Sequence, residues 1–526
     1  MPLLTTVVPE TPRRFSPFSA VVLFLGAAAT FARLRFALPL QAYDDDAFYY
    51  FQIARNIATG HGSTFDGIHL TNGYHPLWML LCVALSWIAS GRAFFAMLQV
   101  VAFISFATCF FAARAVLRPI CRQAILANIA SAAIALQCLI LMHGGMEITL
   151  TLPLALVLCA FRLRRSFVWS RRNAMVYGAL AALVVLSRLD SLLWIAVLLG
   201  AELLLASHQA TGPRRLLLLA ILVGAAPLAI YALSNQYWFH LWMPVSGAAK
   251  ELRLHRGFTL FGLKKSTYLL DQVYGPLVVY PSLLLVVCAT ASLFLPRRSS
   301  VSGDTRAVAV SLMLFPAVQL SALGFTSDWS IWSWYLYPFV LAMLGALLLL
   351  LEDSPAKEAR AAPGFYLPAL LCCSLMMPVG LLYIVTAIAG TERPRWTEFA
   401  LDLQSFARTH PGLYAMGDCA GASGYAMPQP ILQTEGLVMD KGFLENIRQQ
   451  RDLREVLESY GVRYYVTFRA KQVNGCFQVE EPAQAGPDSP HMRTTLCQAP
   501  TANFPVGPVV LRVFDLQPAA KTNESR

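Results

Sequence analysis

Residues Ala42–Trp78 read AYDDDAFYYFQIARNIATGHGSTFDGIHLTNGYHPLW and have the most unusual polar content of the chain. Three consecutive carboxylates, Asp44, Asp45 and Asp46, precede an aromatic-rich amphipathic run, several glycine turns and a His-Pro pair. Apolar segments flank the stretch on both sides, and a simple loop between membrane helices has no structural need for such content. We therefore interpret it as the catalytic loop of a membrane enzyme, with the remaining chain holding a lipid-borne substrate against it.

The composition predicts a polytopic α-helical membrane protein. Of the 526 residues, 56% are hydrophobic and only 13% are charged, and soluble domains carry roughly twice that share of charge. Apolar runs of roughly 17–25 residues, long enough to cross a bilayer, recur along the chain. The first run has no convincing cleavage site and is interpreted as a retained helix. About eleven spans are expected, at roughly 18–40, 94–114, 122–142, 147–162, 174–187, 190–206, 216–235, 274–295, 306–325, 334–351 and 364–388.

The net charge of +11 does not indicate a nucleic-acid partner, because the arginines lie in short loops between apolar spans. That distribution is the orientation signal of a membrane protein, and Arg13 and Arg14 predict a cytoplasmic N-terminus. The acidic loop that follows the first span therefore falls outside. The apolar segment 76–90 is short for a span. We interpret this segment as a re-entrant helix, because this puts every basic loop inside, whereas a full span would place the cluster from Arg162 to Arg172 outside.

The composition after about residue 391 becomes that of a soluble domain. A helical period covers roughly residues 446–460, and strand-like runs cover roughly 463–468 and 509–514. We therefore expect a membrane module over residues 1–390, with a first outer loop at 41–75, and a small α/β domain in the outer compartment over 391–526. An oxidising compartment would permit Cys476 and Cys497 to pair, with Cys419 left over.

The three aspartates are the candidate catalytic residues. Adjacent carboxylates at the exit of a span repel one another beside a low-dielectric boundary, so at least one pKa should rise toward the range useful for a base. The alternative is a solvated helix N-terminus, because Asp favours the N-cap and first turn of a helix. Further charged residues predicted on the same face favour the catalytic interpretation.

Those further residues are the candidate substrate-binding set. His143, Glu147 and Asp190 lie at the predicted outer ends of apolar helices, where ionisable side chains are costly and usually functional or paired. Arg188 and Lys250 lie outside, where cations are disfavoured, and could hold a phosphate leaving group. Helix capping, an Arg188–Asp190 ion pair and a surface lysine are the plainer alternatives.

His75 stands beside Pro76 at the head of the segment 76–90, whose helix dipole also suits an anion. A divalent metal held by the aspartates and His75 stays open, because no ligand spacing specifies one. The aromatic group Trp329, Trp332, Trp334, Tyr335 and Tyr337 is interpreted as an interfacial belt. There is no P-loop, dinucleotide-binding glycine motif, zinc-ligand spacing or Gly-x-Ser-x-Gly elbow.

Together, these motifs resemble the GT-C superfamily of integral membrane glycosyltransferases, close to the protein-mannosyl, aminoarabinose and arabinofuranosyl transferases. The matching motifs are Asp45-Asp46-Ala47, Gly60-His61-Gly62, Asn72-Gly73-Tyr74-His75-Pro76, Gly145-Met146-Glu147, Arg188-Leu189-Asp190, Pro244-Val245-Ser246 with Lys250, Gly417-Asp418, Glu435-Gly436-Leu437 and Gly461-Val462-Arg463-Tyr464-Tyr465.

The resemblance implies inverting transfer of a sugar from a polyprenyl-phosphate donor to a hydroxyl of a lipid, polysaccharide or protein, at the periplasmic face of a bacterial inner membrane. A first-loop aspartate would be the base, and Tyr74 would join the substrate-binding residues. Three aspartates occupy the place of the usual pair, and the motif favours Asp45, then Asp46, with Asp44 third. A carrier for lipid-linked sugars is the main alternative, although carriers usually show repeat symmetry and broken helices at midplane. A scaffold that binds a partner is a third hypothesis.

Overall fold

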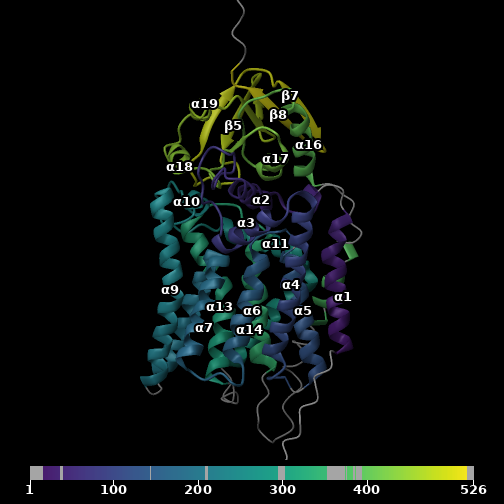
Figure 1. The fold of residues 1–526 in the computed structure, drawn as a ribbon, viewed down its shortest axis with the longest axis vertical. Helices are drawn as coiled ribbons and strands as arrows, with labels where there is room; N and C mark the ends of the chain where they lie inside the picture. Colours follow the sequence, from purple (N-terminus) through teal and green to yellow (C-terminus); the bar gives the residue numbers. More distant parts are fainter. Residues whose placement is uncertain are drawn as a thin grey trace, which may run out of the picture.

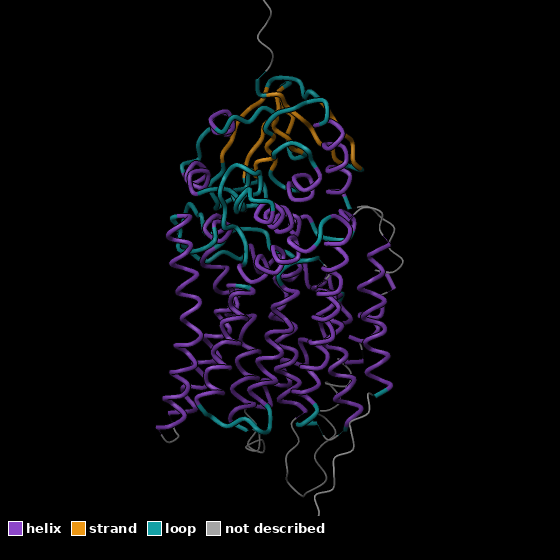
Figure 2. Tube along the Cα trace, viewed as in Figure 1, coloured by secondary structure: helices purple, strands orange, loops and turns teal. Residues whose placement is uncertain are grey.

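The computed structural model describes residues 16–35, 39–121, 123–142, 144–207, 211–293, 302–351, 373–374, 376–382, 385–386 and 394–517. A bundle of long helices forms the lower part, and a smaller α/β region, the C-terminal domain (residues 394–517), covers its upper end (Figure 1). Among the residues that the structure describes, strands occur only in that upper region (Figure 2). The predicted fold class is therefore confirmed, while the predicted boundary at 390/391 lies outside the described residues.

The long helices of the bundle are α1 (Pro17–Phe31), α4 (Gly91–Leu117), α5 (Ala124–Met142), α6 (Ile148–Leu163), α7 (Arg171–Ser187), α8 (Leu192–Ser207), α9 (Thr211–Phe239), α12 (Pro276–Leu293), α13 (Gly303–Thr326) and α14 (Tyr337–Leu351). Six described helical stretches are long and apolar enough to cross a membrane, or seven if a bent pair at Lys264–Tyr274 and Val278–Leu293 forms one span. The helices α6, α7 and α8, of 16, 17 and 16 residues, coincide with three further predicted spans. The eleventh predicted span, at roughly 364–388, lies mostly outside the described residues.

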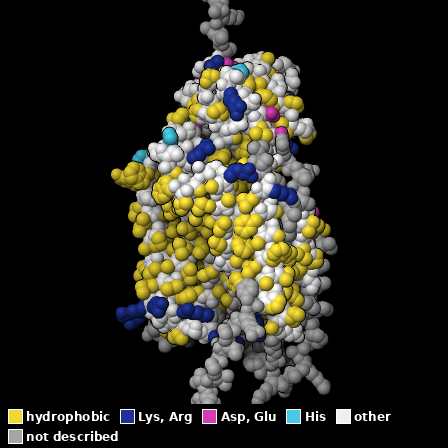
Figure 3. Space-filling view, turned by 45° about the vertical axis from the view of Figure 1, so that its right-hand side comes forward, with side chains coloured by type: hydrophobic (Ala, Val, Ile, Leu, Met, Phe, Trp, Pro, Cys, Tyr) yellow, Lys and Arg dark blue, Asp and Glu magenta, His cyan; other side chains and the backbone are white. Residues whose placement is uncertain are grey.

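The surface of the bundle fits a lipid environment. Hydrophobic side chains cover most of its visible face, and Lys and Arg side chains lie below and above this band (Figure 3). Inside, α5 and α14 are buried along nearly their whole length, whereas α9 exposes Leu222 and Ile230. Large exposed apolar surfaces of this kind are stable only when lipid or another apolar partner covers them.

Shorter elements cross the upper end of the bundle: α2 (Asp45–Ala58), α3 (Pro76–Ile88), α10 (Val245–Lys250), α11 (Phe261–Tyr274), and the 3₁₀ turns η1 (Ala32–Arg35), η2 (Pro39–Gln41), η3 (Leu189–Ser191) and η5 (Ser333–Leu336). Acidic residues in the first turn favour the start of α2, and Pro76 starts α3. α2 lies between the bundle and the C-terminal domain (Figure 1). α3 is 13 residues long and remains near α2, so its re-entrant placement stays a prediction.

The C-terminal domain comprises α16 (Arg395–Ala407), β1 (Tyr414–Met416), α17 (Ala420–Ala426), β2 (Ile431–Gln433), α18 (Lys441–Arg448), α19 (Leu453–Ser459), β3 (Tyr464–Thr467), β4 (Lys471–Val473), β5 (Cys476–Glu481), β6 (Met492–Leu496), β7 (Ala502–Val506) and β8 (Val509–Asp515). One sheet has the order β2-β1-β3-β8-β7, with β2, β1 and β3 parallel and the others antiparallel. The other is the antiparallel sheet β4-β5-β6.

Both predicted strands of this domain are present, as β3 and β8. The prediction of a single helix at roughly 446–460 is wrong. Two helices, α18 and α19, are present, and Gln450, with a positive φ of 50°, lies in the turn between them. Asp452 then caps α19 by accepting a hydrogen bond from the backbone N–H of Glu455. Cys476 and Cys497 form a disulfide, and Cys419 is free.

Three helices of the bundle are joined near both ends. At the lower end, the buried Arg162 of α6 pairs with Glu202 of α8 at 2.7 Å and with Asp304 of α13 at 2.6 Å. At the upper end, the same helices lead to Glu147, Asp190 and Gln319. Glu147 and Asp190 pair with a second arginine, and Gln319 donates to Asp190, as described below. Such paired charges hold the helices in one relative position, because removing one partner leaves a buried charge uncompensated.

Candidate active site

The three aspartates have different surroundings. Both carboxylate oxygens of Asp45 accept hydrogen bonds from the first turn of α17, one from the N–H of Gly421 at 3.1 Å and one from that of Ala422 at 2.8 Å. Gly421 packs so closely that a side chain there would overlap the Asp45 backbone carbonyl. The backbone N–H of Asp44 donates to the carbonyl of Gly144 at 3.1 Å. Asp45 therefore fastens the first loop to the C-terminal domain.

Asp46, by contrast, has a carboxylate that accepts no hydrogen bond from the residues that the structure describes. Burial raises its pKa to about 7, with Lys250 opposing the shift and Asp418, Asp44 and Glu147 adding to it. For Asp45, burial and then Asp46 raise the pKa to about 8, and the two N–H donors oppose this. The Asp44 carboxylate also accepts no hydrogen bond from the described residues, and burial raises its pKa, but the cation that opposes this shift is Arg33. Asp46 is the aspartate with an unbonded carboxylate that is coupled to Lys250, so we take it as the candidate to accept a proton near neutral pH.

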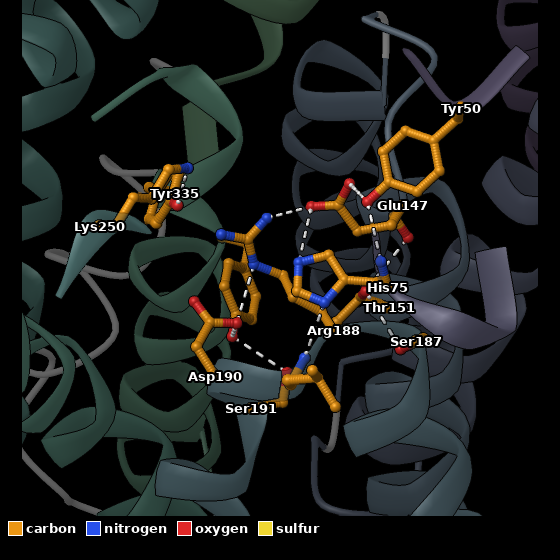
Figure 4. Close-up of polar contacts among 12 residues, drawn as sticks. Tyr50, His75, Glu147, Thr151, Ser187, Arg188, Asp190, Ser191, Lys250 and Tyr335 are labelled. Atoms are coloured by element: carbon orange, nitrogen blue, oxygen red, sulfur yellow. Dashed lines mark hydrogen bonds and ion pairs between the residues drawn. The ribbon is translucent and has the colours of Figure 1, made fainter. Parts of the chain in front are cut away.

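Arg188 is the centre of the cationic side of the site. It follows α7 directly, is only 2% exposed and forms an ion pair with Glu147, at the start of α6 (Figure 4). Its Nε lies 2.9 Å from Oδ1 of Asp190. That oxygen also accepts a hydrogen bond from the hydroxyl of Tyr337 at 3.1 Å, and Oδ2 accepts one from the side chain of Gln319 at 3.0 Å. Two carboxylates hold the guanidinium in a defined orientation, because buried charges need paired partners.

His75 packs against this arginine network. Its Nδ1 accepts a hydrogen bond from the backbone N–H of Leu189 at 3.2 Å, which assigns the proton of the neutral ring to Nε2. Nε2 lies 3.8 Å from Oε1 of Glu147 (Figure 4), and burial lowers the pKa of His75. The hydroxyl of Tyr50 on α2 donates to Glu147 at 3.2 Å and accepts from the N–H of His75 at 3.2 Å. These contacts connect α2 to the arginine.

Lys250 and Arg188 meet at one aromatic ring. Lys250 Nζ donates to the hydroxyl of Tyr335 at 3.1 Å, and the Arg188 guanidinium lies 4.4 Å from the centre of the same ring (Figure 4). Two cations beside one tyrosine favour a bound anion, because an anion would relieve their mutual repulsion. We call Arg188 and Lys250 the cation pair; Tyr335 contacts both of them.

The structure brings most of the predicted site residues together and separates a few. Asp46, His75, Glu147, Arg188, Asp190 and Lys250 form one connected group of hydrogen bonds, ion pairs and electrostatic contacts. Tyr74 instead forms a hydrogen bond with the Ser63 hydroxyl at 2.8 Å, within the first loop. His143 lies outside the described residues. In the described part of the chain, no three His, Cys, Asp or Glu side chains are grouped as ligands of one metal ion.

The predicted aromatic belt is wrong. Trp329, Trp334 and Tyr337 are buried within the protein, and Tyr335 contacts the two cations. The sequence analysis also assigned no role to Tyr50, Gln319, Asp418 or Glu435. Asp418 and Glu435 lie in two of the C-terminal motifs that resemble the GT-C superfamily. The pattern of alternating aromatic and small residues around Tyr335 is typical both of a lipid interface and of a buried turn, so only tertiary contacts distinguish them.

No family model matches the sequence, and the comparison with curated proteins finds no match. Solved structures do resemble the chain. A crystal structure of ArnT from Cupriavidus metallidurans bound to undecaprenyl phosphate has 12% sequence identity and a TM-score of 0.53, covering 86% of this chain and 92% of that one. The apo state of the same protein has 13% identity and a TM-score of 0.51, covering 85% and 91%. At these identities the likeness establishes the fold and leaves the reaction to be argued from the site.

Proposed function

We propose that this chain, which has the GT-C fold that its motifs predicted, is a glycosyltransferase that moves a sugar from a polyprenyl-phosphate donor to an acceptor hydroxyl. The observation that carries the proposal is the free Asp46 carboxylate, electrostatically coupled to Lys250, together with the Arg188 and Lys250 pair at Tyr335. This arrangement supplies a base and a binding site for an anionic leaving group within one site.

The donor phosphate would bind at the cation pair. Tyr335 contacts both cations, and Glu147 and Asp190 also hold Arg188, so the two cations are oriented before the substrate arrives. Preorganised cations stabilise the charge that develops on a departing phosphate more than they stabilise the ground state. The bound undecaprenyl phosphate in the ArnT structure supports a polyprenyl phosphate as the ligand class.

In the proposed reaction, Asp46 accepts the proton of the acceptor hydroxyl while the acceptor oxygen bonds to the anomeric carbon of the sugar. The bond from that carbon to the phosphate oxygen breaks, and its electron pair leaves with the polyprenyl phosphate. The leaving group needs little protonation, since Arg188 and Lys250 neutralise it. A single displacement of this kind inverts the anomeric configuration.

The lipid tail of the donor also has a candidate binding groove. An apolar groove of about 190 Å³ lies between α11, α12, α13 and α14, lined by residues such as Tyr274, Met313 and Phe339. Phe339 is two residues from Tyr337, which contacts Asp190. The groove is therefore lined partly by α14, the helix that begins at this partner of Asp190, and its apolar lining suits an isoprenoid chain.

The placement in a cell remains part of the proposal. Basic residues gather in the loops at the lower end of the bundle, and the disulfide between Cys476 and Cys497 suits an oxidising compartment. Both observations support a bacterial inner membrane with the C-terminal domain in the periplasm. The acceptor is a lipid, polysaccharide or protein hydroxyl.

The proposal is tested with purified protein in detergent and a panel of polyprenyl-phosphate sugars. Release of free polyprenyl phosphate with one donor, together with a new glycosidic product of inverted configuration, is the expected result. Saturable donor binding without release, for every donor tried, would contradict the transferase and favour a carrier of lipid-linked sugars.

The pH dependence of transfer follows from Asp46. Since the base must be ionised and its pKa is raised to about 7, kcat/KM should fall about tenfold per pH unit below pH 7 and level off above it. The donor is a phosphodiester whose charge does not change over this range. A profile that stays flat down to about pH 5, as an ordinary carboxylate would produce, would exclude Asp46 as the base.

A further inference from the structure

The loop between β5 and β6, residues 482–491, links the C-terminal domain to both segments that carry the donor-phosphate ligands. It contacts the residues that follow Lys250 and the residues that precede Tyr335. We call it the β5–β6 loop. We propose that Asp488 of this loop and Asp328 of the bundle are positioning residues that hold Lys250 and Tyr335 in place for the phosphate.

Asp488 fixes the segment after Lys250. Its Oδ2 accepts hydrogen bonds from Nε and Nη2 of Arg253 at 2.9 and 2.6 Å, and its Oδ1 lies 2.8 Å from Nδ1 of His255. The backbone N–H of Leu254 donates to the Asp488 carbonyl at 2.7 Å. Arg253 is only three residues from Lys250, at the end of the six-residue helix α10, so its position limits where the lysine can point.

Asp328 fixes the segment before Tyr335 and is only 2% exposed. Its carboxylate accepts hydrogen bonds from the N–H of Asp488 at 2.8 Å and from the Thr259 hydroxyl at 3.2 Å, and its carbonyl accepts one from the N–H of Gly486. Ser330 continues the contact by donating from its N–H to the carbonyl of Gln484 at 3.2 Å. One turn later the chain reaches η5 and Tyr335.

The same loop also reaches the acidic side of the site. The side chain of Gln484 donates to Asp418 at 2.7 Å, and its backbone N–H donates to the buried Glu435 at 3.2 Å. Asp418 is one of the charges that raise the pKa of Asp46. The β5–β6 loop therefore contacts the surroundings of the base and both segments of the phosphate site, which explains why this loop would need defined polar contacts with the bundle.

The inference rests on the proposed function, and the experiment separates the two. The full chain is purified in detergent as wild type, Asp488→Asn, Gly486→Ala and the control Asp515→Asn. Asp488 and Asp515 have side chains 22% and 20% exposed and each pairs with an arginine, but Asp515 contacts neither segment of the phosphate site. A methyl group at Gly486 would overlap the Asp328 carboxylate, which perturbs the same contact without changing charge.

The first measurement is backbone hydrogen exchange. Asp488→Asn and Gly486→Ala should speed exchange in residues 245–260 and 327–336 by about tenfold or more, while Asp515→Asn leaves both segments unchanged. This readout needs no ligand, so it decides the positioning role even if the wild type binds no polyprenyl phosphate. If the wild type binds no polyprenyl phosphate, the proposed function is contradicted, while the hydrogen-exchange result still tests the positioning role. Unchanged exchange in these segments in both loop variants would overturn the inference.

The second measurement is the dissociation constant for undecaprenyl phosphate. We expect Asp488→Asn to weaken binding about tenfold and Asp515→Asn to change it less than twofold. In a Lys250→Met background, Asp488→Asn should weaken binding much less, because a residue that acts through Lys250 is not additive with its removal. Fully additive losses would show that Asp488 does not act through the lysine and would overturn its positioning role.

Discussion

Asp46→Asn is expected to lower the rate of glycosyl transfer about 10³-fold and to leave the fold intact, because this carboxylate would act as general base and accepts no hydrogen bond from the described residues. The rate is measured as release of polyprenyl phosphate at saturating donor and acceptor. Donor affinity should change little, since the phosphate binds to other residues. A variant that keeps more than a tenth of the wild-type rate would contradict the assignment.

Asp45→Asn serves as the matched control on the neighbouring residue. Both oxygens of Asp45 accept backbone hydrogen bonds from α17, and an asparagine can replace only one of these acceptors. We expect a lower unfolding temperature, reflecting weaker docking of the C-terminal domain, with a smaller loss of rate than in Asp46→Asn. The opposite order of rate losses would assign the base to Asp45, as the motif Asp45-Asp46-Ala47 first favoured.

Arg188→Leu is expected to have the largest effect on stability, about 3–5 kcal/mol, because it leaves the Glu147 and Asp190 carboxylates without their shared cation. Binding of polyprenyl phosphate should be lost as well. Thermal unfolding in detergent and equilibrium binding at a temperature where the variant is folded measure the two effects. Glu147→Gln added to Arg188→Leu should recover part of the stability and none of the binding.

Arg162→Leu is the control for this second prediction. Arg162 is also a buried arginine with two carboxylate partners, but it lies at the opposite end of the same three helices. It should lower the free energy of unfolding by somewhat less than Arg188→Leu, because Asp304 is 55% exposed and only Glu202 would be left as a buried unpaired charge. The affinity for polyprenyl phosphate should stay within about twofold of the wild-type value. Equal losses of affinity in both variants would mean that Arg188 acts through the fold and not through contact with the phosphate.

The sequence by itself determined the class of the protein and the ingredients of the site. Long apolar runs specify membrane-embedded helices, because a segment in lipid must satisfy its backbone N–H and C=O groups with its own hydrogen bonds, as a helix does. Glu147 was recognisable because an ionisable residue at the end of such a helix is costly without a functional or structural partner. The Asp-rich first loop stood out for the same reason. Arg188 and Lys250 were recognisable because cations are disfavoured on the outer side.

The tertiary structure decided what each of these residues does. Asp45 and Asp46 are neighbours in sequence, and they differ because Gly421 and Ala422, more than 370 residues away, bond to one and not the other. The sequence placed Tyr335 in an interfacial aromatic belt, whereas the structure shows that it contacts the two cations Arg188 and Lys250. Periodicity and propensity describe a residue's own element, whereas hydrogen bonds and pKa shifts depend on which distant groups the fold brings beside it.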